Sequence, residues 1–167
     1  SGCGKTTLML ALLRLLPQAG KISGGQVLFD GKDILQLDDK AMSELRWDEI
    51  SIVFQGAMNA LNPVRTVGDQ IAEAIRRHEK LSKEATRKRV EELLELVGIA
   101  KHRRDQYPHQ YSGGMRQRAM IAMALACYPK IIIADEPTTA LDVMIQAQIL
   151  ELLADLRDKL GLAVIFV

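Results

Sequence analysis

One stretch of this chain has its apolar residues at regular helical spacing. Val90, Leu93, Leu94 and Val97 stand at i, i+3, i+4 and i+7, so a helix there would carry them on one face. Ser82 precedes the stretch as a candidate N-cap, and a glycine follows it. The pattern predicts a helix with one buried face, packed within a helical subdomain.

Short uninterrupted apolar runs form the second pattern. The run Ile131–Ala134 is typical of a strand that is buried on both faces of a parallel sheet. Along the chain such segments alternate with helical ones, which is the order that an α/β fold with parallel strands requires. The predicted helices cover residues 7–16, 40–46, 67–78, 82–97, 112–127 and 143–160, and the predicted strands cover residues 26–29, 50–54, 131–134 and 162–167.

The first seven residues, SGCGKTT, match the last part of the phosphate-binding loop G-x-x-x-x-G-K-[ST]. Glycines allow the backbone N–H groups to point at one centre, where the positive end of the next helix favours a polyphosphate. Lys5 is expected to reach the β- and γ-phosphates, and Thr6 to place its hydroxyl on Mg²⁺. A flexible glycine-rich terminus is the alternative interpretation. The predicted nucleotide-binding residues here are Ser1, Gly2, Cys3, Gly4, Lys5, Thr6 and Thr7.

Two carboxylates follow the apolar run that ends at Ala134. Ligands of open α/β folds bind at the carboxyl edge of the sheet, which is where these side chains are expected. Asp135 is predicted to hold Mg²⁺ through water, and Glu136 to orient and polarise the water that attacks the γ-phosphate. A solvated acidic turn is the alternative, which the phosphate loop in the same chain makes less attractive.

Residues 111–118, YSGGMRQR, predict a second helix N-terminus suited to phosphate. Ser112 is the candidate cap, and Gly113 and Gly114 follow it. Taken alone, this segment favours an ordinary helix cap, and it is the second phosphate-ready site in the same chain that supports the phosphate interpretation.

Together, SGCGKTT, the FQ pair at Phe54 and Gln55, YSGGMRQR, IIIADEP and TALD resemble the nucleotide-binding domain of ATP-binding cassette (ABC) transporters. The resemblance covers nearly the whole chain. It implies an α/β P-loop NTPase fold of the ABC ATPase type with a helical signature subdomain, truncated at both ends. It also implies ATP and Mg²⁺ as cofactors.

The same resemblance implies roles for single residues. Gln55 is expected to contact Mg²⁺ and sense the transmembrane partner, residues 112–114 to bind the γ-phosphate held by the opposite subunit, and Asp142 to lie in a loop that crosses the dimer interface. The expected catalytic residues are Glu136, Gln55 and Lys5; the expected Mg²⁺ ligands are Thr6, Gln55 and Asp135; and Ser112, Gly113, Gly114 and Asp142 join the phosphate loop in binding nucleotide.

A finer resemblance concerns residues 56–71, GAMNALNPVRTVGDQI, and residues 107–110, YPHQ. Both are similar to segments of the peptide/nickel importer subfamily, with Met115 and Tyr111 replacing the glutamine and leucine common in the signature. The resemblance implies a peripheral ATPase on the cytoplasmic face of the inner or plasma membrane. Its expected partners are a second ATPase domain, identical or related, transmembrane permease subunits and, indirectly, a periplasmic or surface solute-binding protein. Its expected solute is a di- or oligopeptide, or nickel.

Composition narrows the alternatives. The 167 residues are 48% hydrophobic and 26% charged, which excludes intrinsic disorder. A net charge of +1 gives no footprint for nucleic acid, so no nucleic-acid partner is expected. A soluble ABC-type ATPase of DNA repair or chromosome maintenance is the alternative function. Those proteins usually insert a coiled coil or zinc module before the signature, whereas this chain has only a compact helical stretch there.

The predicted organisation is a single, partial ABC ATPase domain over residues 1–167. Residues 1–55 and 129–167 are expected to form the catalytic core, and residues 66–128, approximately, the helical subdomain. Because the chain opens inside a glycine-rich motif and closes inside an apolar run, we expect a fragment that is poorly stable and inactive when expressed alone.

Overall fold

A computed structural model describes residues 3–54, 60–139 and 141–167. Its α-helices are α1 (Lys5–Leu12), α2 (Asp39–Asp48), α3 (Val67–His78), α4 (Lys83–Leu96), α5 (Gly113–Ala124) and α6 (Val143–Leu160). Its strands are β1 (Leu28–Phe29), β2 (Lys32–Asp33), β3 (Ile50–Val53), β4 (Ile131–Ala134) and β5 (Ala163–Phe166), and its 3₁₀ helices are η1 (Ile34–Gln36), η3 (Lys101–Asp105) and η4 (Pro108–Gln110). None of the helices among these residues has both the length and the apolar character needed to cross a membrane.

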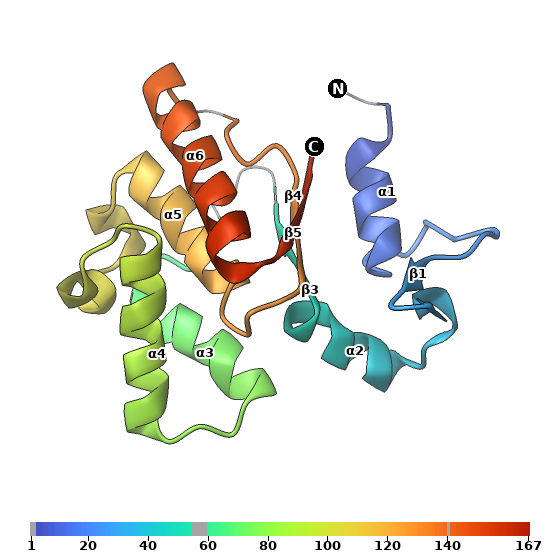
Figure 1. The fold of residues 1–167 in the computed structure, drawn as a ribbon, viewed down its shortest axis with the longest axis horizontal. Helices are drawn as coiled ribbons and strands as arrows, with labels where there is room; N and C mark the ends of the chain where they lie inside the picture. Colours follow the sequence, from blue (N-terminus) through green and yellow to red (C-terminus); the bar gives the residue numbers. More distant parts are fainter. Residues whose placement is uncertain (1–2, 55–59, 140) are drawn as a thin grey trace.

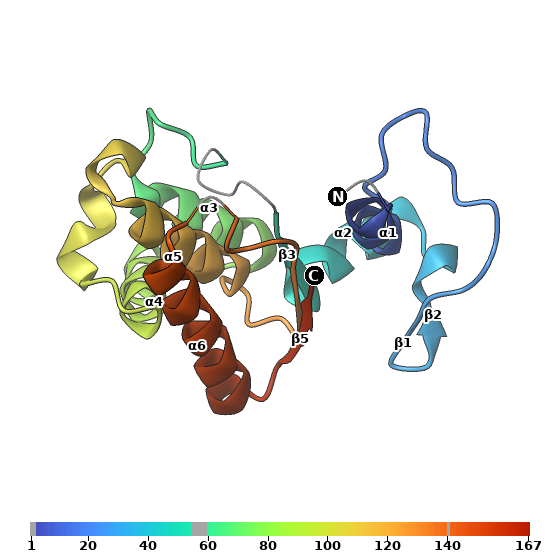
Figure 2. The ribbon, with the colours of Figure 1, turned by 90° about the horizontal axis from the view of Figure 1, so that it is seen from above.

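A parallel sheet with the strand order β3-β4-β5 lies at the centre of the fold. Ile131 of β4 pairs with Ile50 of β3 and with Ala163 of β5, so β4 has a neighbour on each side. Figures 1 and 2 show α5 and α6 on one side of this sheet and α1 and α2 on the other. This layering confirms the predicted α/β fold and explains the uninterrupted apolar sequence of β4.

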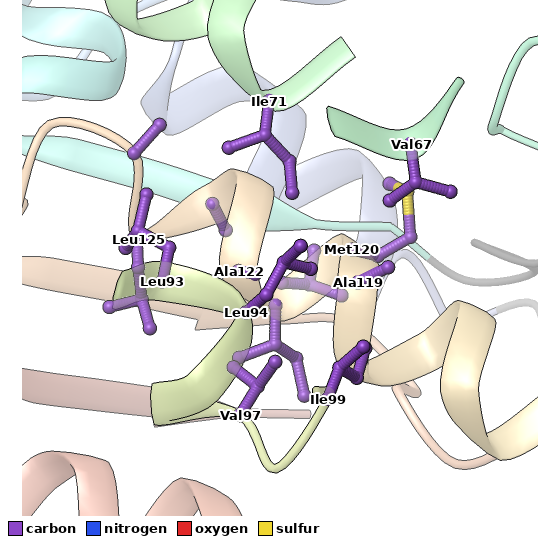
Figure 3. Close-up of a cluster of buried hydrophobic side chains, with 14 of the residues drawn as sticks. Val67, Ile71, Leu93, Leu94, Val97, Ile99, Ala119, Met120, Ala122 and Leu125 are labelled. Carbon is purple, nitrogen blue, oxygen red and sulfur yellow. The ribbon is translucent and has the colours of Figure 1, made fainter. Parts of the chain in front are cut away.

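The two faces of the sheet belong to two hydrophobic cores. Ile132 packs in a large core with α3, α4, α5 and α6, whereas the next residue, Ile133, packs with α1 and α2 in a smaller one. Neighbouring residues of a strand point to opposite faces, so one short strand serves both cores. Figure 3 shows Ile71 of α3, Leu94 of α4 and Ala122 of α5 converging in the large core.

Side-chain caps fix where most helices begin. The predicted bounds of α3 and α6 agree with the structure, since Thr66 and Asp142 accept hydrogen bonds from the first-turn N–H groups of Asp69 and Ile145. Ser82 caps α4 in the same way, as its sequence position predicts.

The first helix departs most from its prediction. The sequence indicated residues 7–16, but α1 begins at Lys5 and ends at Leu12, and Arg14 takes a left-handed φ of 52°. The Arg46 guanidinium donates to the carbonyls of Leu13 (2.8 Å) and Arg14 (3.1 Å), so long-range hydrogen bonds take up oxygens freed where the helix stops.

The predicted strand at residues 26–29 shortens to β1 and pairs with β2, which the sequence analysis missed. Asp30 and Gly31 connect the two with φ values of 48° and 77°. Positive φ at both central residues is typical of a type I′ hairpin turn, the turn that an Asp-Gly pair favours. The other predicted elements differ from the observed ones only at their ends, with α5 stopping at Ala124 rather than residue 127.

Candidate nucleotide-binding site

The phosphate loop leads into an α-helix with no side chain at its cap. Gly4 is the N-cap of α1 and adopts a left-handed φ of 86°, a conformation that favours glycine. In the described part of the chain the other five α-helices begin at a residue whose side chain accepts a first-turn hydrogen bond: Asp38, Thr66, Ser82, Ser112 and Asp142. Gly4 therefore offers no side-chain acceptor of its own to the first N–H groups of α1, and an anion suits that position.

The predicted catalytic lysine has another predicted nucleotide-binding residue, Cys3, as its neighbour. Lys5 Nζ lies 3.3 Å from Cys3 Sγ on the exposed surface. Hydrogen bonding to the Lys5 ammonium lowers the pKa of the Cys3 thiol. Thr6 and Thr7 are exposed in the first turn of α1, while Ser1 and Gly2 lie outside the described residues. The sequence offered one signal for the contact between the Lys5 and Cys3 side chains, namely a cysteine that stands two residues before the lysine.

Asp135 lies buried where β4 ends, with only 1% of its surface exposed. Its N–H donates to the carbonyl of Val53 on β3 at 3.0 Å, whereas neither carboxylate oxygen has a hydrogen-bond partner among the described residues. A buried acceptor without a partner is costly, and Mg²⁺ prefers carboxylate oxygen. The chemistry of this side chain therefore fits the predicted metal role.

Glu136 follows in a left-handed conformation, with φ of 45°. Its N–H donates to the Val167 carbonyl at 2.9 Å, and its Oε2 accepts a hydrogen bond from Thr139 Oγ1 at 3.1 Å. A left-handed φ is uncommon for a residue other than glycine and persists where the surroundings hold it. Thr139 thus helps to orient the predicted catalytic carboxylate, a role that the sequence analysis did not assign.

Several hydrogen bonds hold residues 111–118, which we call the signature segment. Ser112 Oγ accepts from Met115 N–H at 3.3 Å, and Arg116 Nε donates to the Tyr111 carbonyl at 3.2 Å. The Tyr111 hydroxyl donates to the carbonyl of Arg103 at 3.0 Å, and burial raises the pKa of this phenol to about 12. These hydrogen bonds hold the first turn of α5 and the residue that precedes its cap, Tyr111.

The first turn of α6 lies against this segment. Asp142 caps α6 by accepting from Ile145 N–H at 3.0 Å, so its carboxylate has a structural partner as well as a predicted nucleotide role. The backbone of Gly114 approaches the Ile145 side chain so closely that a Cβ on Gly114 would lie 2.9 Å from Ile145 Cγ2. The structure thereby brings together two segments that the sequence connected only through their family resemblance.

Figure 1 shows where these parts lie in the fold. The first turns of α1 and α6 and the carboxyl end of β5 are on the same side of the molecule, drawn at the top. β4 runs parallel to β5 and ends on that side too. Gln55, the remaining predicted catalytic and Mg²⁺-binding residue, falls outside the described residues, as does Ala140 of the predicted interface loop.

Residues 1–139 match the sequence model of a protein family described as ABC transporter. This chain belongs to the ABC transporter family. Solved ABC structures agree with this assignment. The chain aligns with the ATP-binding cassette MJ0796 in a dimeric post-hydrolysis state bound to ADP and Pi with a TM-score of 0.81 and 34% identity, covering 98% of this chain and 68% of that one. Against CbiO1 from Clostridium perfringens, part of the ABC transporter complex CbiONQ, the TM-score is 0.83 and the identity 34%, covering 99% and 63%.

Curated relatives of this ABC family member carry peptide-transport names. It is 54% identical over 170 residues to the probable peptide ABC transporter ATP-binding protein y4tR of Sinorhizobium fredii, covering 100% of this chain and 51% of the relative. The oligopeptide transport ATP-binding protein OppD of Bacillus subtilis is also 54% identical over 170 residues, with coverage of 100% and 48%. The dipeptide transport ATP-binding protein DppD of the same organism is 54% identical, with coverage of 100% and 51%. The chain thus spans about half the length of the curated relatives it matches.

Proposed function

We propose that this chain is the ATP-binding and ATP-hydrolysing part of a subunit that powers a membrane ABC importer. The observation that carries the proposal is the pairing of α1, whose cap residue Gly4 has no side chain, with a buried Asp135 whose carboxylate oxygens have no hydrogen-bond partner among the described residues. The helix end supplies N–H groups to phosphate, and the carboxylate supplies oxygen to a divalent cation.

ATP binding is assigned to the phosphate loop. Gly4 lets the backbone turn into α1, so that first-turn N–H groups face the β- and γ-phosphates, and Lys5 neutralises their charge. The Lys5 ammonium then exchanges its thiol partner, Cys3, for phosphate oxygens. Thr6, Gln55 and Asp135 would hold Mg²⁺, which supplies neutralisation of the charge on the phosphate oxygens.

Hydrolysis is assigned to Glu136. Its carboxylate orients a water molecule, accepts a hydrogen bond from it and takes its proton as the oxygen bonds to the γ-phosphorus. The bond between the γ-phosphorus and the bridging oxygen breaks, which leaves ADP and inorganic phosphate. The hydrogen bond from Thr139 holds the carboxylate in place for this step.

A second cassette, identical or related, completes the site in our proposal. Residues 112–114 of each cassette face the γ-phosphate bound by the other, and Asp142 lies at the interface between them. Ser112 Oγ accepts from Met115 N–H through a lone pair, so its proton stays available to donate to a phosphate oxygen. The dimeric MJ0796 cassette, bound to ADP and Pi, supports this arrangement.

The proposed solute is a di- or oligopeptide. Nickel is the alternative solute, which the resemblance to the peptide/nickel importer subfamily also implies. The peptide-transport names of relatives at 54% identity support peptides, and no relative named above points to DNA repair. The proposed complex adds transmembrane permease subunits and a solute-binding protein, and places this subunit on the cytoplasmic face of the membrane.

Replacing Glu136 by Gln in the complete protein tests the hydrolytic assignment. The variant keeps the shape of the side chain but loses the base, so we expect ATP turnover to fall by about 100-fold or more while ATP still binds. Glu151→Gln, an exposed substitution on α6, is the matched control and should retain turnover. Undiminished turnover by the Glu136 variant would contradict the assignment.

Uptake of labelled dipeptide or of nickel ions into vesicles containing the permease then separates the two solutes.

A further inference from the structure

The first turn of α5 touches α6 at a position where only glycine fits. Gly114 is the second residue of α5, and a Cβ built on it would lie 2.9 Å from Cγ2 and 3.5 Å from Cδ1 of Ile145. Carbon atoms in van der Waals contact prefer a separation of about 3.5 to 4.0 Å. The backbone of the signature segment therefore comes as near to Ile145 as a residue without a side chain allows.

Ile145 has little freedom to move away. Its N–H donates to the Asp142 carboxylate at 3.0 Å, which fixes it in the first turn of α6. Its side chain is half-buried and packs against the large hydrophobic core. A β-branched side chain in a helix has one strongly preferred χ1 rotamer, so Cγ2 cannot swing aside without strain.

The segment on the other side of this contact is fixed as well. Ser112 caps α5, the Arg116 guanidinium holds the Tyr111 carbonyl, and the Tyr111 hydroxyl holds the Arg103 carbonyl. Beside Ile145, the Gln146 side chain donates to the Leu141 carbonyl at 2.9 Å. Hydrogen bonds thus hold the start of α5 and the start of α6 separately, and the two segments meet at Gly114 and Ile145.

We propose that Ile145 is a positioning residue, whose contact with Gly114 sets the distance between the signature segment and the loop that ends at Asp142. The two loops then approach a second cassette as one unit. This inference rests on the proposed function, in which both loops face that cassette. Groups that act on a reacting phosphate need placement within about 0.5 Å, so a shift of α5 against α6 should reduce turnover more than ATP binding.

A double-mutant cycle in the complete protein tests the contact without nucleotide. Gly114→Ala should lower the Tm by about 2 °C or more, because the added Cβ clashes with Ile145. In an Ile145→Ala background the same substitution should leave the Tm unchanged or raise it, since alanine is the better helix former. Met144→Ala, a neighbouring substitution at a side chain that is 72% exposed, is the control and should not alter the effect of Gly114→Ala. An equal loss in all backgrounds would overturn the contact.

Steady-state kinetics of the same variants test the positioning role. Gly114→Ala should lower kcat for ATP about tenfold or more with little change in KM, and adding Ile145→Ala should restore at least about threefold of that loss. Ile145→Val keeps both γ-carbons and should remain within about twofold of wild type. If the Tm recovers in the double variant but kcat does not, Ile145 has only a packing role and the proposal fails. Absence of ATP hydrolysis by the wild-type protein would instead refute the proposed function and leave the Tm cycle interpretable.

Discussion

The two helices that begin at predicted phosphate sites, α1 and α5, differ in what holds their first turn. At α1 the cap is Gly4, the next residues are exposed, and the Lys5 side chain donates to the neighbouring Cys3 thiol. At α5 the cap is the Ser112 hydroxyl, and Tyr111 is buried with its hydroxyl bonded to η3. One helix end is open to solvent and the other is braced by its neighbours.

This difference separates two ways of building a phosphate site. The cap residue of α1, Gly4, has no side chain to accept from the first N–H groups, so a bound anion can accept from them and add to the stability of that end. The first turn of α5 already has its cap and its packing contacts, so its position is set before any ligand arrives. We therefore expect α1 to determine ATP affinity and α5 to determine how well a second cassette is engaged.

Loss of the Lys5 ammonium should have the largest effect on the open end. Hydrogen bonds to charged groups contribute about 1.5 to 3 kcal/mol, so Lys5→Ala should raise the Kd for ATP by roughly 10- to 150-fold. Fluorescent ATP titration of the complete protein measures this, with Lys21→Ala, another exposed lysine outside the loop, as the matched control. Equal affinities for the two variants would remove the phosphate role of Lys5.

Removal of the Tyr111 hydroxyl should affect the braced end alone. Tyr111→Phe keeps the buried ring but leaves the Arg103 carbonyl without this donor, so the free energy of unfolding should fall by about 1 to 2 kcal/mol. Tyr128→Phe changes an exposed tyrosine and should be nearly neutral. Urea unfolding of both variants gives the two values, and the Kd for ATP should be the same in each. A large loss of ATP affinity in Tyr111→Phe would mean that the two ends are not independent.

Raising the pH should also lower the free energy of unfolding through Tyr111, and with a smaller effect. Burial raises the pKa of Tyr111 from its ordinary value of 10 to about 12, so the phenol ionises in the unfolded chain before it does so in the folded one. Its contribution to stability is complete below pH 10 and is lost as the pH rises towards 12. Cys127, whose pKa burial raises from 9 to about 12, adds a loss of the same sign that starts near pH 9. Unfolding free energies between pH 8 and 12 should fall less steeply in Tyr111→Phe than in wild type; parallel curves would contradict this assignment.

Local signals in the sequence predicted the elements that local interactions determine. β4 is a buried central strand with an unbroken apolar sequence, and α6 starts at the Asp142 cap and stops before Gly161. The predicted end of this helix at residue 16 was wrong, because Arg46, which is distant in sequence, holds the carbonyls of Leu13 and Arg14 where α1 has already ended. Such a contact leaves no trace in the spacing of nearby residues.

The same distinction between local signals and long-range contacts applies to the candidate site. The phosphate loop and the carboxylates of Asp135 and Glu136 were recognisable from contiguous residues. The approach of Gly114 to Ile145 joins two helices and appears only once they pack, and a glycine in the signature gave no indication of which side chain it must accommodate. The Thr139 hydrogen bond to Glu136 likewise depends on the left-handed turn at Glu136.

Labelling of the two cysteines tests most directly whether ATP occupies the open end of α1. Cys3 is exposed with its pKa lowered by Lys5, whereas Cys127 is half-buried with its pKa raised to about 12, so iodoacetamide should modify Cys3 much faster. At Mg²⁺-ATP concentrations of about 100 times Kd, the rate at Cys3 should fall by about tenfold or more, with Cys127 as the unchanged internal reference in the same peptide mass spectra. An unchanged Cys3 rate under saturating nucleotide would contradict the placement of the ATP phosphates at Gly4, Lys5 and Thr6.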